Sequence, residues 1–162
     1  MKFINCILSI VTFLMLYSCA NPPEYPLEPV IAYKSISTNT INQSAIRADS
    51  AMITISFTDG DGDLGRQDMD SVDIFIVDNR IDFVQPGFVI PFIGQQGVGK
   101  GISGEISFIA PPNCCIFENG LPPCQPSTEF PIDTVTYDIY IMDRAGNESN
   151  RVTTEPIYIR CN

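Results

Sequence analysis

The sequence predicts an all-β protein, and three observations lead to this prediction. From Val30 onward, hydrophobic and polar residues alternate in short runs with a period of two, which is the pattern of half-buried strands. Clusters of Gly, Pro, Asn and Asp, which favour turns, separate the runs. No long stretch has helical periodicity. With 162 residues and 44% hydrophobic content, the chain is long enough for one domain with its own core.

The N-terminus has the pattern of an export signal. Lys2 precedes an apolar run of about 15 residues, which is short of the roughly 20 that cross a bilayer as a helix. The run ends in Leu16-Tyr17-Ser18-Cys19, which resembles the lipobox of bacterial lipoproteins. The resemblance implies that residues 1–18 are a cleaved signal peptide and that Cys19 receives a diacylglyceryl group.

Residues 19–29 are expected to form a tether between the lipid and the folded domain. Four of the nine residues from Asn21 to Pro29 are proline, which favours an extended, stiff chain. Ala20, rather than Asp, follows the lipidated cysteine and fits sorting to the outer membrane. We therefore expect a lipid-anchored protein of the cell envelope, either periplasmic or surface-exposed.

Residues 30–162 are expected to fold as a sandwich of about seven strands. The parity of each run gives its inward positions, for example Ile53, Ile55 and Phe57. Seven short strands at this spacing suit two facing antiparallel sheets. The predicted strands are 31–37, 51–58, 71–78, 88–93, 104–109, 134–142 and 153–161.

An acidic loop, Asp59-Gly60-Asp61-Gly62-Asp63, follows the strand predicted at 51–58. Alternating carboxylates can direct several oxygens to one point, and glycine lets the backbone curl between them, which suits Ca²⁺. The loop is not an EF-hand, because the twelfth position is Asp70 instead of Glu and strand patterns flank it. The alternative interpretation is an acidic turn that needs no ion.

The segment Asp143-Arg144-Ala145-Gly146-Asn147, at the end of an alternating run, resembles the last hairpin of immunoglobulin-like and fibronectin-III-like domains. With the acidic loop and the lipobox, the chain is similar to small envelope lipoproteins of Bacteroidota. This resemblance implies an immunoglobulin-like sandwich, in which the acidic loop and the 143–147 loop emerge at the same end. Asp143 would then join Asp59, Asp61 and Asp63 around the Ca²⁺.

The six cysteines divide into two groups. Cys6 and Cys19 belong to the export region. An exported chain meets an oxidising compartment, where the remaining four should form two disulfides. A bond between adjacent cysteines is strained, so we expect one member of the adjacent pair to bond Cys124 and the other to bond Cys161. The four cysteines are Cys114, Cys115, Cys124 and Cys161.

Composition narrows the function classes. A formal charge of −10 argues against a nucleic-acid partner, which needs a basic face. Histidine is absent, which removes the usual general base, so we expect no enzyme; an enzyme would have to use the loop carboxylates as acid and base. The favoured class is a membrane-anchored structural or interaction module with a protein partner. The alternative is a glycan-binding accessory lipoprotein of a polysaccharide-uptake system, although the chain has no tryptophan to stack on sugars.

Overall fold

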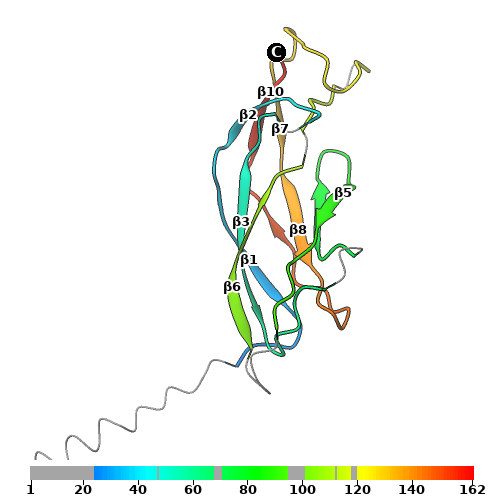
Figure 1. Cartoon of the computed structure of the whole chain (residues 1–162). Coiled ribbons are helices and arrows are strands. Elements are labelled where there is room, and N and C mark those ends of the chain that lie inside the picture. The colour runs from blue at the N-terminus through cyan, green and yellow to red at the C-terminus, as the bar shows by residue number, and fades with distance from the viewer. Residues whose placement is uncertain (1–23, 47, 68–70, 95–100, 112, 118–119) are drawn as a thin grey trace, which may run out of the picture.

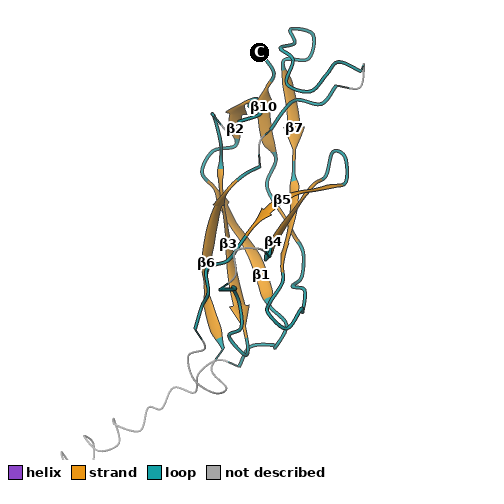
Figure 2. Ribbon diagram, turned by 45° about the vertical axis from the view of Figure 1, so that its right-hand side comes forward, coloured by secondary structure: helices purple, strands orange, loops and turns teal. Residues whose placement is uncertain are grey.

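The chain folds into β-strands joined by loops (Figures 1 and 2). The computed structural model describes residues 24–46, 48–67, 71–94, 101–111, 113–117 and 120–162. These residues form ten strands and no helix, so the predicted all-β class is confirmed. The predicted signal peptide, and Cys19 with it, lies outside the described residues.

The first sheet has the order β1-β3-β6 and is antiparallel throughout. It consists of β1 (Val30–Ile36), β3 (Met52–Asp59) and β6 (Ile102–Ile109). Buried residues alternate with exposed or half-buried ones along β3, and Ile53, Ile55 and Phe57 are buried as their parity predicted. β3 lies in the middle of this sheet, and its inner face is the centre of the core.

The second sheet faces the first and has the order β5-β4-β8-β9. Its strands are β4 (Ile74–Asp78), β5 (Phe83–Phe88), β8 (Tyr137–Ile141) and β9 (Val152–Thr153). Ile76 pairs with Ile139 across β4 and β8, and both side chains are fully buried. The rings of Phe88 and Phe108 are 5.4 Å apart between their centroids, which places β5 against β6 of the first sheet.

A third, small sheet lies at one end of the molecule, where the C-terminus is found (Figure 1). It has the order β2-β10-β7, from β2 (Thr40–Asn42), β7 (Ile132–Val135) and β10 (Ile157–Arg160). β10 pairs with β2 in parallel and with β7 in antiparallel orientation. Ile41, Val135 and Ile159 are buried and extend the core to this end.

Two of the seven predicted strands are each divided in the structure. The run 134–142 separates into β7 and β8, and the run 153–161 separates into β9 and β10. At the break, the backbone N–H of Tyr137 donates to Oγ1 of Thr154 and that of Thr154 donates to the carbonyl of Tyr137. Pro156, which lacks a backbone N–H, stands between β9 and β10. These contacts let the ribbon pass from one sheet to another.

The strand predicted at 88–93 is wrong, because the strand occupies Phe83–Phe88 instead. Arg80 to Asp82 form the turn after β4, and Asp82 adopts a positive φ of 49° there, which starts the return strand early. Pro86 lies within β5, at the edge of its sheet, where a missing N–H is tolerated. By parity, the strand predicted at 71–78 would point Val72 inward together with Ile74 and Ile76. Val72 is instead 39% exposed, because β4 begins only at Ile74.

Candidate metal site and the adjoining cleft

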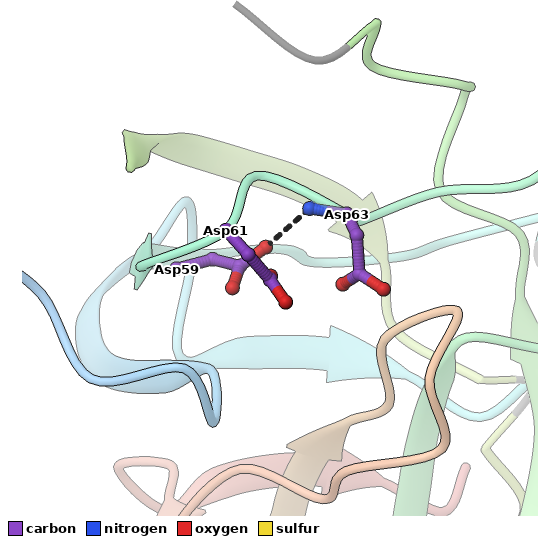
Figure 3. Close-up of side chains that lie close together, drawn as sticks. All are labelled: Asp59, Asp61 and Asp63. Carbon is purple, nitrogen blue, oxygen red and sulfur yellow. Dashed lines mark hydrogen bonds between the residues drawn. The ribbon is translucent and has the colours of Figure 1, made fainter. Parts of the chain in front are cut away.

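Three aspartates of the acidic loop meet at one end of the molecule. Asp59 is the last residue of β3, and Asp61 and Asp63 follow it in the loop. One carboxylate oxygen of each lies within 4.8 Å of the others, and Figure 3 shows the three side chains converging. Gly62, with a φ of 70°, lets the backbone curl. The N–H of Asp63 donates to Oδ2 of Asp59 over 2.9 Å, which closes the loop.

Each of these carboxylates has one buried oxygen without a hydrogen bond. Asp59 is fully buried, and Asp63 is only 8% exposed. Oδ1 of Asp59, of Asp61 and of Asp63 is buried and accepts no hydrogen bond from the described residues. Leaving a buried acceptor unsatisfied costs about 1–3 kcal/mol, and more when the group is charged. A single cation at this place would compensate all three oxygens.

The surroundings disfavour the ionised state of these carboxylates. Burial, followed by the charge of Asp61, raises the pKa of Asp59 to about 6. Burial and then the charge of Asp143 raise the pKa of Asp63. Both effects arise because negative charge is removed from water and placed beside negative charge. A bound cation would reverse both effects.

Asp143 lies beside the acidic loop but does not belong to the group of three. The loop around it contacts Asp63 directly: the N–H of Arg144 donates to the Asp63 carbonyl over 3.2 Å, and the N–H of Ala145 donates to Oδ2 of Asp63 over 3.1 Å. The acidic loop and the 143–147 loop therefore lie side by side, as expected. However, both carboxylate oxygens of Asp143 accept hydrogen bonds from Asn147, over 2.7 and 2.8 Å. Asp143 closes its own turn, and the structure does not bring it into the cluster as a fourth ligand.

The N-terminal segment packs against the same loop. The N–H of Gly60 donates to the carbonyl of Pro26 over 2.7 Å. A Cβ atom at position 60 would clash with the carbonyl oxygens of Tyr25 and Pro26, so the close approach requires glycine. The part of the predicted tether that the structure describes is thus held on the domain beside the three aspartates.

A cleft of about 460 Å³ adjoins the acidic loop, and sequence analysis did not anticipate it. It is lined by Arg66, Gln67, Phe92 and Arg144. Arg66 follows the acidic loop and Arg144 lies in the 143–147 loop, so their proximity was implicit once the two loops were expected at one end. The sequence did not indicate that Phe92 would join them, because residues 88–93 were predicted to be a strand.

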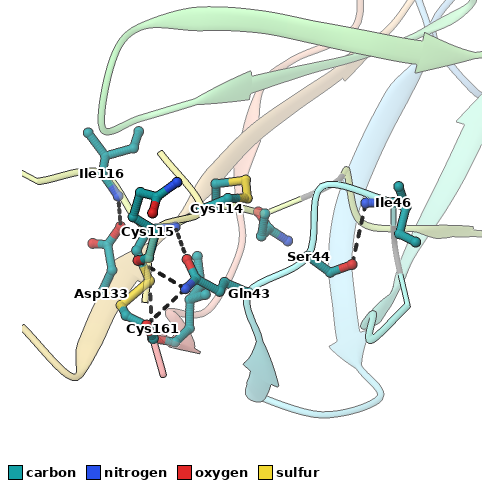
Figure 4. Close-up of a disulfide and its surroundings, with 12 residues drawn as sticks. Gln43, Ser44, Ile46, Cys114, Cys115, Ile116, Asp133 and Cys161 are labelled. Carbon is teal, nitrogen blue, oxygen red and sulfur yellow. Dashed lines mark hydrogen bonds between the residues drawn. A yellow bond between two sulfur atoms is a disulfide. The ribbon is translucent and has the colours of Figure 1, made fainter. Parts of the chain in front are cut away.

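The disulfide pattern agrees with the sequence prediction and resolves its open alternative. Cys114 bonds Cys124, and Cys115 bonds Cys161. Cys161 stands next to the C-terminal residue, and the C-terminus lies at the end of the molecule away from the loop that follows β3 (Figure 1). Figure 4 shows the surroundings of the disulfide-bonded cysteines. Nε2 of Gln43 donates to the Cys161 carbonyl over 2.8 Å, and Oε1 of Gln43 accepts the N–H of Cys115. The long loop before β7 is therefore tied to β10 and to the segment after β2.

No family model, no curated protein and no solved structure matches the chain. In the part of the chain that the structure describes, no helix has the length and hydrophobicity needed to cross a membrane. The function proposed next therefore rests on the geometry of the acidic loop and on the motifs in the sequence.

Proposed function

We propose that the protein is a non-catalytic lipoprotein of the cell envelope whose immunoglobulin-like domain binds one Ca²⁺ through Asp59, Asp61 and Asp63. The domain acts as a structural or interaction module, and the lipid on Cys19 holds it at the outer membrane. The proposal rests on one observation above all: each of the three converging carboxylates has a buried oxygen with no hydrogen bond from the described residues.

Ca²⁺ suits this group of ligands better than Mg²⁺ does. Ca²⁺ accepts six to eight oxygens in flexible geometry, whereas Mg²⁺ requires a nearly ideal octahedron and retains several waters. The three carboxylates come from one irregular loop and have different exposures, since Asp61 is only half-buried. Water can therefore complete the shell on the side of Asp61. Few protein ligands and partial exposure favour the weak affinity of extracellular modules, about 10⁻⁴ to 10⁻³ M.

The order of the strands supports the immunoglobulin-like assignment. The sheets β1-β3-β6 and β5-β4-β8-β9 have the orders A-B-E and C′-C-F-G of such domains when the strands are lettered along the chain. In that scheme the acidic loop is the B–C loop and residues 143–147 belong to the F–G loop. These loops meet at one end of the sandwich.

The lipid anchor is supported by the lipobox motif ending at Cys19 and by the position of the first described residues. Pro26 is held against Gly60, so the chain enters the domain at its acidic end. Five residue steps separate Cys19 from Glu24, and an extended chain spans roughly 17 Å over that length. The Ca²⁺ loop would then face the membrane, and the disulfide-bonded end would face away from it.

Calorimetric titration of the detergent-solubilised protein with Ca²⁺ tests the site. We expect one weak site in the wild type and its loss in Asp61→Asn, which removes a negative charge and a ligand oxygen at a carboxylate whose Oδ1 accepts no hydrogen bond from the described residues. Asp82→Asn is the matched control, since it removes the same charge from an exposed residue. If the wild type binds no Ca²⁺, or if both variants bind it equally, the three carboxylates are not the ligands.

Intact-mass analysis of the protein purified from its native membrane tests the anchor. The expected product begins at Cys19 and has the added mass of a diacylglyceryl group and an amide-linked acyl chain. Cys19→Ser should abolish the acylation. A native product that contains residues 1–18, or an unmodified Cys19, would contradict the proposed lipidation.

A further inference from the structure

The cleft next to the acidic loop has the features of a binding site for a negatively charged ligand. Two arginines line it, in a protein whose formal charge is −10. Its described residues come from three loops: Arg66 and Gln67 from the loop between β3 and β4, Phe92 from the loop after β5, and Arg144 from the loop between β8 and β9. Loops on a rigid sandwich are where such domains place binding residues.

The floor of the cleft is firmly held. The segments 64–66 and 90–93 are joined by backbone hydrogen bonds, from Arg66 to the Ile90 carbonyl and from Ile93 to the Leu64 carbonyl. Nη1 of Arg144 donates to the carbonyls of Leu64 and Gly65 over 2.9 and 2.7 Å. Nη1 also donates to the Ile93 carbonyl over 3.5 Å, so the Arg144 guanidinium joins the β3–β4 loop and the loop after β5 to its own loop. A site whose side chains are already fixed loses little conformational entropy when a ligand binds.

Both guanidinium groups retain hydrogen-bond donors for a ligand. Arg66 uses Nε for Asp73 and Nη2 for the Asp143 carbonyl, and its Nη1 donates to none of the described residues. Arg144 uses Nη1 for backbone carbonyls, and its Nε and Nη2 likewise donate to none of them. An arginine with adjacent free N–H groups matches the two oxygens of a carboxylate.

A cation in the acidic loop would make the charges near the cleft less unfavourable for an anion. Asp73 balances Arg66 in an ion pair of 3.1 Å. Arg144 has no carboxylate within ion-pair distance among the described residues, although the charge of Asp63 acts on it from nearby. A Ca²⁺ bound to Asp59, Asp61 and Asp63 would offset two of their three negative charges. That would lower the electrostatic cost of placing an anion beside Arg144.

The remaining wall of the cleft suits a sugar ring. Phe92 is 47% exposed, and Arg144 lies over its ring at 5.0 Å from the centroid. The exposed part of the ring offers an apolar platform. Gln67 is exposed at the rim, and its amide can both donate to and accept from hydroxyl groups. The volume of about 460 Å³ lies within the range of small-molecule sites.

We propose that the cleft formed by Arg66, Gln67, Phe92 and Arg144 binds an acidic sugar residue through its carboxylate. Arg66 and Arg144 receive the carboxylate oxygens, Phe92 contacts the apolar face of the sugar ring, and Gln67 binds a hydroxyl group. The inference rests on the proposed role as an interaction module and assigns the class of its ligand. It requires the arginines in their observed positions and does not require that the cation be Ca²⁺.

Calorimetry of the detergent-solubilised full chain with a disaccharide ending in glucuronate tests this inference, in buffers with millimolar Ca²⁺ and in buffers with chelator. The matched probe is the same disaccharide ending in glucose. We expect binding of the acidic disaccharide in Ca²⁺ and at least tenfold weaker binding of the neutral one. Equal binding of both probes, or binding of neither, would overturn the proposal. So would binding of a short glutamate peptide without binding of the sugar, because the site would then recognise acidic peptides.

Three variants locate the binding. Arg66→Lys keeps the charge and can retain the ion pair with Asp73 but removes Nη1, the donor of Arg66 that is left for the ligand, so we expect about tenfold weaker binding. Phe92→Leu removes the ring at a half-exposed position and should weaken binding several-fold with unchanged folding.

Arg151→Lys is the control, because Arg151 lies over Tyr140 and does not line the cleft. If Arg151→Lys weakens binding as much as Arg66→Lys does, the sugar binds elsewhere. Loss of sugar binding with retained Ca²⁺ binding separates this inference from the proposed Ca²⁺ site.

Discussion

The two ends of the domain are held together by different chemistry. At the end where the C-terminus lies, two disulfides join the loop before β7 to itself and to Cys161. At the other end, three carboxylates converge with unsatisfied buried oxygens, and hydrogen bonds hold the neighbouring loops. A covalent link is indifferent to the ions in solution, whereas the acidic end should respond to them. With the proposed cation, one end of the sandwich would be closed by covalent bonds and the other by an ion whose occupancy depends on its concentration.

The disulfide end also contains ion pairs, in which it differs from the acidic end. Arg80 forms ion pairs of 2.6 Å with both Asp78 and Asp133 and also donates to the Cys114 carbonyl. Here each carboxylate faces a cation of the same chain. At the acidic end, Asp59, Asp61 and Asp63 have no such partner among the described residues, which is why an external cation is proposed there and not at Asp78.

The largest effect is expected from removal of the longer disulfide. Cys115→Ala with Cys161→Ala opens a link between residues 46 positions apart, whereas Cys114 and Cys124 are 10 apart. Loop-closure entropy predicts a loss of about 4 kcal/mol in the free energy of unfolding for the first pair and about 3 kcal/mol for the second. Denaturant unfolding of both double variants measures this difference.

The same variants test whether the two ends are independent. Ca²⁺ should stabilise the disulfide variants by as much as it stabilises the wild type, because the sites lie at opposite ends and share no contact. A Ca²⁺ effect that disappears when the disulfide is removed would show that the two ends are coupled and would contradict the comparison made above.

A smaller effect is expected from Ca²⁺ itself. At a free concentration ten times the dissociation constant, binding to the folded state adds about 1.4 kcal/mol of stability, which raises the melting temperature by about 4 °C for a domain of this size. Asp61→Asn should melt at the same temperature in Ca²⁺ and in chelator. Asp82→Asn should retain the full shift. A wild type that melts identically in both buffers would leave the loop as an acidic turn.

The last effect concerns pH: a rise in pH should lower the stability of the folded state in chelator but should strengthen the binding of Ca²⁺. The pKa of Asp59 is raised from 3.8 to about 6 by burial and by Asp61. In chelator, the folded state therefore binds more protons than the unfolded state between these values, and stability should fall as the pH rises from about 4 to about 6. Ca²⁺ requires the carboxylate, so its affinity should be about tenfold weaker at pH 5 than at pH 7. Melting curves in chelator at pH 4 to 6 measure the change in stability, and calorimetry at pH 5 and pH 7 measures the change in Ca²⁺ affinity.

The sequence predicted the fold class and the core of the long strands because burial on one face imposes a period of two. Ile53, Ile55 and Phe57 are inward for this reason. It did not predict that the run 134–142 divides, because the break depends on Thr154, a residue of another strand connection. The alternating pattern is identical on either side of such a break.

The sequence also predicted part of the candidate site, namely the part that depends on neighbouring residues. The group Asp59, Asp61 and Asp63 is local in sequence, and local spacing is sufficient to bring its oxygens together. The role of Asp143 depends on whether its carboxylate faces the acidic loop or its own turn, and the hydrogen bonds of Asn147 decide this. The cleft depends on three separate loops, so no single stretch of sequence contains its pattern.

The most direct test of the Ca²⁺ site is anomalous diffraction from crystals of the protein grown in Ca²⁺ or soaked in a lanthanide. The account predicts one peak beside Oδ1 of Asp59, Asp61 and Asp63, with Ca²⁺ to oxygen distances of about 2.3–2.6 Å and no peak in Asp61→Asn crystals. A wild-type map with no peak at the loop under saturating Ca²⁺, or with a peak held only by other residues, would contradict it.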